Sequence, residues 1–348
     1  MTAWIRRSVT NGAPAYPLLI LFGLNAVDEL DRAAFGILLP EIRDAFGLDI
    51  QGVLSVVAVV GLVSLLLQVP VAYLADRGNR VRIATLGALA WGVFSLLTGL
   101  ATGIVALAVF RIGSGLGKAV VDPTHNSLLA DYYDIESRAR VFSFHRAANA
   151  LGAFVGPLLA GVLAYSYGWR TPFLLFAVPT LVLVVLATRL REPVSGVHER
   201  RAAGADEDAA LTAVPTVSFA EAWRAVWKVD CLRRIWWSLP FLSASLIGFV
   251  SLAGLLYEQA FDLDERARGF IAAGVEPAQF VGLLIGARIS GRLLADDPGR
   301  ALRFLAGASV VTAGGLVLFG LAPSVPVAIF GNVVIAVLLS ILGPGILA

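Results

Sequence analysis

Long apolar stretches recur along the whole chain, and they restrict its fold more than any other feature of the sequence. Each is about 20 residues long, which lets an α-helix cross the ~30 Å hydrocarbon core of a bilayer. The mean hydropathy of +0.80 and the 58% of hydrophobic residues exclude an ordinary soluble domain. We therefore predict an all-α polytopic membrane protein with spans at 15–39, 52–74, 83–102, 104–128, 141–166, 171–189, 235–257, 271–294, 303–322 and 325–347.

The connections between these spans differ in charge on the two sides of the membrane. Arginines concentrate before the first span, in the loops after the second and fourth spans, in the 189–234 segment and at 300–303. The opposite side has fewer arginines, and acidic residues partly offset them. By the positive-inside rule, the N-terminus and the long central connection are cytoplasmic. The strong preference for Arg over Lys, with many Ala, Gly and Val residues, indicates a bacterial genome of high GC content. Together with the predicted spans, this leads us to expect a multi-pass protein of a bacterial cytoplasmic (inner) membrane.

A short internal repeat indicates the domain organisation. The sequence YLADRGNR at 73–80 follows the second span, and LLADDPGR at 293–300 follows the eighth. Recurrence six helices later predicts two pseudo-repeated six-helix bundles, of which the second is incomplete. The predicted parts are an N-terminal bundle at 1–189, a cytoplasmic linker at 190–234 and a four-helix part of the C-terminal bundle at 235–348. We expect a chain truncated after about ten of twelve helices; the alternative is a complete ten-helix protein.

The two repeated loops are candidates for a gate. Charged groups at helix ends can bind neighbouring helices in one state and release them in another. The alternative is that their arginines only mark the cytoplasmic side of the membrane. The residues of this predicted gating loop are Asp76, Arg77, Arg80, Asp296 and Arg300.

Within the linker, a short segment has the pattern of an amphipathic helix. Ser218 followed by Glu221 is a capping-box pattern, and Trp223 and Trp227 then recur on one helical face. This predicts a helix that lies on the inner membrane surface. The alternative is a solvated linker helix.

The fourth apolar stretch carries polar residues along one face, and the first carries charges near its middle. Between 105 and 128, helical spacing aligns Arg111, Gly115, Lys118, Asp122, His125 and Asn126. The four charges of the first span would cost roughly 10–14 kcal/mol on a helix facing lipid, against about 6 kcal/mol returned by its apolar residues. These charges must therefore face the interior of the bundle. They are Asp28, Glu29, Asp31 and Arg32.

Several of these motifs together resemble the major facilitator superfamily of secondary transporters. The 76–80 loop resembles its signature after helix 2, and Arg111 followed by Gly115 resembles its helix-4 signature. Gly152, Gly156 and Pro157 in the fifth span resemble the glycine-proline pattern associated with its exporters. The resemblance implies two helical bundles around a central cavity, and it implies a role of these glycines in a hinge or in preventing leak. From the residues alone we expect packing first, because glycines let helix backbones approach closely.

Within the superfamily, the sequence is most similar to spinster-like transporters. Asp31 and Arg32 match their helix-1 pattern, and Arg111 matches their helix-4 arginine. The resemblance marks Asp31 as a proton-coupling carboxylate. The chain departs from the pattern at Lys118, where those relatives have a Glu. This departure puts in question both a coupling carboxylate pair and lysolipid-type substrates.

Depth in the membrane predicts which charges of the two helices meet. Asp28 and Lys118 both lie near the midplane, whereas Asp31 and Arg111 both lie about 6–7 Å outside it. Since helices 1 and 4 line the cavity in the resembled superfamily, we expect the pairs Asp28–Lys118 and Asp31–Arg111. Lys can titrate where Arg cannot, so we expect a switchable pair that opens by protonation or by an anionic substrate competing for the Lys. The alternative is a static structural ion pair. Asp122 extends this predicted coupling or substrate site inward.

His125, His145 and Arg146 are predicted to lie toward the inner side. They form a candidate cytoplasmic relay, because His titrates near neutral pH. The alternative, which we favour, is that these residues only line the wet inner mouth of the helices. Pro123 predicts a kink in the fourth span, since Pro removes a backbone hydrogen bond.

Other classes of protein have no support in the sequence. We find no His-Glu-x-x-His, phosphate-binding loop, Gly-x-Ser-x-Gly or cysteine cluster, so we predict no enzyme, no metal and no cofactor. The net charge of +2 is too small and dispersed for nucleic-acid binding. We predict a secondary transporter, a monomer in the lipid bilayer, that exports a small organic or amphiphilic solute with proton coupling by alternating access. The alternative is a non-transporting module, either a sensor or the membrane half of a larger assembly.

Overall fold

A computed structural model describes residues 2–211, 218–230, 233–234, 237, 249, 252–296 and 298–347. All regular secondary structure in these ranges is helical, which confirms the predicted all-α class. Three predicted site side chains, those of Asp76, Asp122 and Asp296, lie outside the described part. Residues 252–261 are helical, and the other helices are α1 (Thr2–Ser8), α2 (Tyr16–Ile37), α3 (Leu39–Ala45), α4 (Ile50–Arg77), α5 (Arg80–Gly99), α6 (Ile104–Lys118), α7 (Val121–Tyr132), α8 (Ile135–Tyr167), α9 (Arg170–Ala187), α10 (Val197–Ala202), α11 (Glu207–Leu211), α12 (Phe219–Trp227), α14 (Glu265–Asp296), α15 (Pro298–Gly320) and α16 (Val325–Leu347).

Many of these helices have the length and composition of membrane spans. Over the described residues, six helices are long and apolar enough to cross a bilayer, or seven if the bent pair α3 and α4 forms one span. α2 is also long enough, with 22 residues, but it is not among those six and carries four charged residues. Most of the predicted span 235–257 falls outside the described residues. The protein is thus a multi-pass membrane protein.

Side-chain caps explain where several of the long helices begin. The Asp49 carboxylate accepts a hydrogen bond from the Gly52 amide at 2.7 Å at the start of α4. Asn79 caps α5 in the same way, and Asp134 caps α8. Such caps satisfy backbone N–H groups that have no partner within the helix. α8 ends at Tyr167, and the next residue, Gly168, has a φ of 87° that suits a residue without a Cβ.

The predicted fourth span is two helices with a break between them. α6 ends at Lys118 and α7 begins at Val121, so the break precedes Pro123. In this position Pro123 lies in the first turn of α7, where the missing N–H leaves no hydrogen bond unmade. The helix is therefore interrupted near the predicted kink, although α6 and α7 together still form one candidate span from Ile104 to Tyr132.

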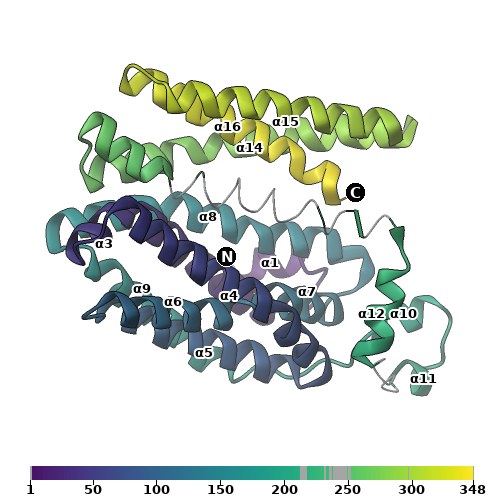
Figure 1. The fold of residues 1–348 in the computed structure, drawn as a ribbon. Coiled ribbons are helices and arrows are strands. Elements are labelled where there is room, and N and C mark those ends of the chain that lie inside the picture. Colours follow the sequence, from purple (N-terminus) through teal and green to yellow (C-terminus); the bar gives the residue numbers. More distant parts are fainter. Residues whose placement is uncertain are drawn as a thin grey trace.

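The helices pack in two groups that meet along α8 (Figure 1). α14 packs against α16 and α8, and α15 packs against α16. On the other side of α8, α2 packs against α8 and α9, while α5 packs against α6 and α9. We use "N-terminal half" for residues 1–189 and "C-terminal half" for residues 235–348; as domain boundaries these ranges remain a prediction.

Glycines of α8 allow close helix contacts on both of its sides. A Cβ on Gly152 would lie 2.5 Å from the Ala26 carbonyl oxygen of α2, and one on Gly156 would lie 3.0 Å from the Leu30 carbonyl oxygen. These positions leave no room for a larger side chain. α2 is therefore held directly against α8.

The contact between α8 and α14 is equally close and joins the two halves. A Cβ on Gly161 would lie 2.5 Å from the Glu265 carbonyl oxygen, and one on Gly269 would lie 2.5 Å from the Pro157 carbonyl oxygen. Each helix thus presents a glycine to the backbone of the other. The halves touch here backbone to backbone.

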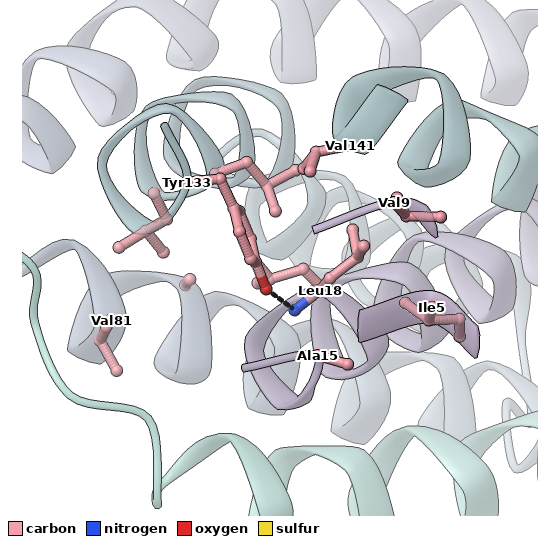
Figure 2. Close-up of a cluster of buried hydrophobic side chains, with 11 residues drawn as sticks. Ile5, Val9, Ala15, Leu18, Val81, Tyr133 and Val141 are labelled. Carbon is pink, nitrogen blue, oxygen red and sulfur yellow. Dashed lines mark hydrogen bonds between the residues drawn. The ribbon is translucent and has the colours of Figure 1, made fainter. Parts of the chain in front are cut away.

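A buried apolar cluster closes the end of the N-terminal half where the chain begins (Figure 2). Ile5 of α1 packs into it together with Leu18 and Val141. The Tyr133 hydroxyl accepts a hydrogen bond from the Leu18 amide at 3.1 Å and donates one to the Pro14 carbonyl at 2.8 Å. Tyr133 thereby satisfies a backbone N–H in the first turn of α2, the helix that carries Asp28 and Asp31.

Candidate functional site

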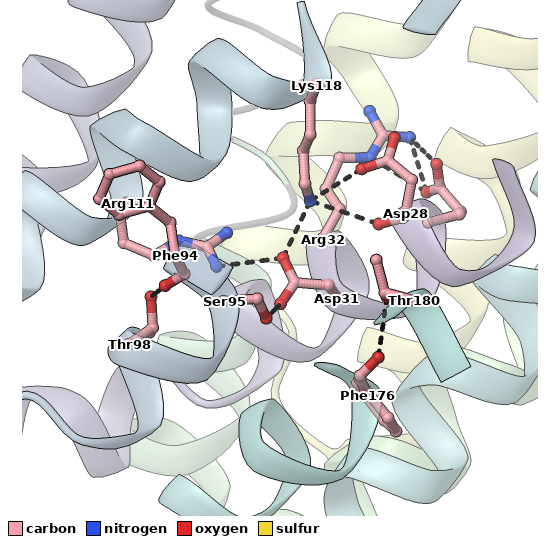
Figure 3. A network of polar contacts seen from close by, with 11 residues as sticks. Asp28, Asp31, Arg32, Phe94, Ser95, Thr98, Arg111, Lys118, Phe176 and Thr180 are labelled. Carbon is pink, nitrogen blue, oxygen red and sulfur yellow. Dashed lines mark hydrogen bonds and ion pairs between the residues drawn. The ribbon is translucent and has the colours of Figure 1, made fainter. Parts of the chain in front are cut away.

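The centre of the candidate site is Asp31, a fully buried carboxylate in the middle of α2. Arg111 of α6 donates a hydrogen bond to it at 3.1 Å, and the Lys118 ammonium lies 2.9 Å from the same oxygen. The Ser95 hydroxyl of α5 donates to the other carboxylate oxygen. Figure 3 shows Asp31 between Lys118 and Arg111. Three helices thus converge on one carboxylate.

Lys118 bridges two carboxylates of α2. Its Nζ lies 2.9 Å from Asp28 Oδ1 as well as 2.9 Å from Asp31 Oδ2. The Lys118 ammonium also lies 5.3 Å from the centre of the Trp91 ring, within the range of a cation–π contact. Both pairs expected from depth, Asp28–Lys118 and Asp31–Arg111, are present. The contact between Lys118 and Asp31 was not expected. It forms because the long Lys side chain extends beyond the membrane depth of its own Cα to that of Asp31.

These four side chains form a cluster without net charge, which we call the Asp31 cluster: Asp28, Asp31, Arg111 and Lys118. Two carboxylates face two cations, so each buried charge has a counter-ion. The Arg111 guanidinium also lies over the Phe35 ring, 4.2 Å from its centre. Burial would make an unpaired charge very costly here. Any proton or ion that enters the cluster must therefore rearrange its pairs.

Arg32 lies apart from the Asp31 cluster, although it is adjacent in sequence. It forms an ion pair at 2.6 Å with Glu29, three residues earlier in α2. The Arg32 side chain is 69% exposed, whereas the Asp31 side chain is 1% exposed. The structure thus brings together four of the predicted polar residues of spans 1 and 4, whereas Arg32 pairs with Glu29.

Sequence analysis missed Glu276 of α14. This carboxylate interacts electrostatically with Glu29 and Arg32 of the other half and with the Gln279 side chain of its own helix. An acidic residue inside the apolar run 271–294 was the available signal, since ionisable residues in membrane spans are by default functional candidates.

The predicted relay histidines lie together inside the N-terminal half. His125 Nδ1 of α7 lies 3.3 Å from His145 Nε2 of α8, and both rings are buried. The Asn25 amide of α2 donates to the His145 carbonyl at 3.3 Å and to Asn149 at 2.6 Å. The favoured expectation of a wet mouth is therefore wrong for these two histidines, because helix packing excludes water from them. Arg146, in contrast, is exposed.

Arg80, from the predicted gating loop, is the centre of a buried network at the end of the N-terminal half predicted to face the cytoplasm. It forms ion pairs with Asp131 of α7 and, at 2.7 Å, with Glu192 of the linker. It also donates to the Pro193 carbonyl at 2.9 Å. Arg80 therefore binds the start of the linker to the N-terminal half. Its role is more than to mark the cytoplasmic side of the membrane. Arg77 and Arg300 are exposed.

At the opposite end, ion pairs connect the two halves. Arg43 of α3 lies 3.1 Å from Glu258, and Glu41 of α3 forms an ion pair with Arg268 of α14. Arg268 also donates at 3.2 Å to the carbonyl of Ile37, the last residue of α2. We call these contacts the α3 clamp. From the sequence, these charged residues were assigned only to the connections on the non-cytoplasmic side of the membrane.

Comparisons with known proteins agree with the fold and with the resemblance seen in the sequence. The family profile described as Major Facilitator Superfamily matches residues 21–348. The chain is 27% identical over 269 residues to the "Probable L-galactonate transporter" of Escherichia coli (strain K12), covering 74% of this chain and 57% of that protein. It is 28% identical over 261 residues to an "MFS-type efflux pump" of Mycolicibacterium smegmatis, covering 71% of this chain and 53% of that protein.

The chain thus spans little more than half the length of these two relatives. Among solved structures, it is similar to a bacterial homolog of the human lysosomal transporter Spinster in an inward-facing and unoccupied conformation. The TM-score is 0.72 with 22% sequence identity, covering 95% of this chain and 74% of that chain. Because the family profile covers nearly the whole chain, the chain belongs to the major facilitator superfamily.

Proposed function

We propose that this chain forms the transporting part of a secondary transporter that moves a small organic or amphiphilic solute by alternating access, as a proton-coupled exporter. The observation that carries the proposal is the Asp31 cluster, in which a titratable Lys118 bridges Asp28 and Asp31 at 2.9 Å each. Charges buried at this depth in a membrane protein mark proton or substrate pathways. The family supports transport rather than catalysis.

In this mechanism, the Asp31 cluster changes partners during turnover. The Asp28 side chain is 18% exposed and that of Asp31 only 1%, so a proton that enters the cluster reaches Asp28 first. Protonated Asp28 no longer attracts Lys118, which then keeps its contact with Asp31 or moves toward an anionic group of the solute. Arg111 cannot deprotonate and keeps Asp31 paired throughout.

The α3 clamp supports a link between this exchange and the movement of the halves. The helix that carries Asp28 and Asp31 ends at Ile37, and Arg268 of the other half binds the Ile37 carbonyl. A shift of α2 after an exchange of partners therefore acts directly on a contact between the halves. Discrete arrangements of this kind turn a local charge change into a movement of domains.

The export direction has two supports. The glycines and Pro157 of α8 resemble the pattern associated with exporters, and one similar protein is named an efflux pump. A second candidate function, uptake of an organic anion, is favoured by a different observation. Other similar proteins are named as transporters of L-galactonate, galactarate or D-glucarate, and hexuronate. Lys118 and Arg111 are cations that a carboxylate could approach.

The test is transport by the full-length protein in liposomes that contain a pH-sensitive dye. We expect a solute gradient to move protons in the wild type, and Asp31→Asn to abolish this movement while solute binding remains measurable. A panel of sugar acids and a panel of lipophilic cations, offered from each side, distinguish the two candidates and the direction. Solute movement in the wild type without proton movement would refute proton coupling, and no movement with either panel would refute the transport proposal.

A further inference from the structure

The linker helix α12 has one apolar face and one polar face, on which Arg224 and Lys228 accompany Glu221. Its capping box is present, with the Glu221 amide donating to the Ser218 hydroxyl at 3.3 Å and the Glu221 carboxylate accepting from the Ser218 amide at 3.0 Å. Such reciprocal bonds fix the start of a helix that has only nine residues. α12 is therefore a defined structural element within the linker.

The apolar face of α12 carries two partly exposed tryptophans. Trp223 and Trp227 stack with ring centres 5.4 Å apart and planes 13° from parallel. They are 42% and 41% exposed, which is a large apolar area for two indole rings to leave in contact with water. Helical spacing puts Val226 on the same face. Trp is the residue type enriched where a membrane meets water.

The charge around this face is basic. Residues 218–234 contain four basic and two acidic residues, a formal charge of +2. Asp230 is already paired with Arg233. Arg224 and Lys228 follow the polar side of α12, one turn apart, and both are exposed. Figure 1 shows α12 near α10 and α11, at the end of the molecule away from α3, where it runs across the direction of the long helices.

We propose that α12 binds the surface of the adjacent leaflet, with Trp223 and Trp227 inserted at the headgroup level and Arg224 and Lys228 on anionic phospholipid. A helix across the spans at their end lies parallel to the membrane surface, where its apolar face meets acyl chains and its basic side meets headgroup phosphates. Because Arg80 fastens the start of the linker to the N-terminal half, α12 anchors the remainder of the linker to lipid. This inference does not depend on what the protein transports.

The test measures the depth of each face of α12 in the full-length protein. Nitroxide labels are placed on single cysteines at Trp223→Cys, Trp227→Cys or Ala225→Cys in a Cys231→Ser background, since Cys231 is the only cysteine. Ala225 lies on the opposite side of the helix and is exposed, so it is the matched control. The protein is reconstituted in phosphatidylcholine vesicles with or without phosphatidylglycerol, and collisions of each label with oxygen and with a water-soluble nickel chelate are compared.

We expect a several-fold higher ratio of oxygen to nickel collisions at positions 223 and 227 than at 225 in the phosphatidylglycerol vesicles. The difference should shrink in pure phosphatidylcholine, and likewise when Arg224→Gln and Lys228→Gln are combined. Frequent nickel collisions at all three positions would overturn the proposal in favour of a solvated linker helix. Few collisions of either kind at 223 and 227 would show that α12 packs on protein, and a difference independent of phosphatidylglycerol would overturn the role of anionic lipid.

Discussion

Replacing Lys118 with alanine tests whether the Asp31 cluster works in transport or only stabilises the fold. At 2.9 Å and an effective dielectric constant of about 20, each of the two Lys118–carboxylate contacts is worth about 6 kcal/mol before desolvation is subtracted. Removal of one partner from a buried pair typically costs about 3–5 kcal/mol. We expect the lower end of that range for Lys118→Ala, because Asp31 keeps Arg111 and Ser95.

The decisive comparison adds Asp28→Asn to Lys118→Ala. The double variant has no unpaired carboxylate at position 28, so we expect it to recover much of the lost stability, on the order of 2 kcal/mol. Proton-coupled transport should stay lost, because the exchange of partners needs both groups. The assays are thermal unfolding in detergent and solute-driven proton movement in liposomes, both normalised to folded protein.

A variant of the other lysine serves as the control for Lys118→Ala and for the double variant. Lys228→Ala removes the only other lysine, which is exposed on the linker, and should leave stability and proton coupling unchanged. If the double variant regained proton-coupled transport together with stability, the cluster would be a static structural pair. Wild-type transport by Lys118→Ala itself would lead to the same conclusion.

Two further predictions concern contacts between the halves. Gly269→Ala should lower the free energy of unfolding by about 1–3 kcal/mol, because its Cβ would lie 2.5 Å from a carbonyl oxygen of α8. The control is Gly274→Ala in the same helix, whose Cβ meets nothing within 4 Å and which should be neutral. Equal melting temperatures for the two variants would contradict the close contact between α8 and α14. Glu41→Arg and Arg268→Glu should each destabilise the protein by about 3 kcal/mol, and the double variant should recover most of this loss. If the double variant lost as much stability as the two single variants added together, the ion pair between residues 41 and 268 would contribute nothing to stability.

Much of the fold follows from the sequence because membranes leave few alternatives. Hydrocarbon requires every backbone polar group of a span to be bonded internally, so 20 apolar residues can only become a helix or remain outside. The break before Pro123 was also predictable, since Pro cannot continue the ladder of hydrogen bonds. α1 was not predicted: Ile5 is buried, but a seven-residue helix has too few residues for a clear periodic pattern.

The charged site was predictable in part, and the reason lies in geometry. Counting 1.5 Å per residue from the ends of two spans gives the depth of each side chain, so the level of Asp28, Asp31, Arg111 and Lys118 could be matched. Depth does not decide which neighbour a charged side chain pairs with, so the ion pair of Arg32 with Glu29 was missed. Contacts between the halves were also missed, because they depend on how two bundles dock.

The charges of the Asp31 cluster suggest why Asp28 accompanies Lys118 in this chain. The spinster-like transporters that it resembles carry a Glu where this sequence has Lys118, so an acid there with Asp31 and Arg111 would leave a charge of −1. Lys118 without Asp28 would leave +1, and Asp28 restores neutrality. We expect Lys118→Glu alone to accumulate poorly, because three carboxylates would then face one guanidinium. Adding Asp28→Asn brings the charge to −1, and we expect it to recover folding measured by thermal unfolding in detergent. If Lys118→Glu were as stable alone as with Asp28→Asn, the two positions would be independent, and the argument that they balance each other would fail.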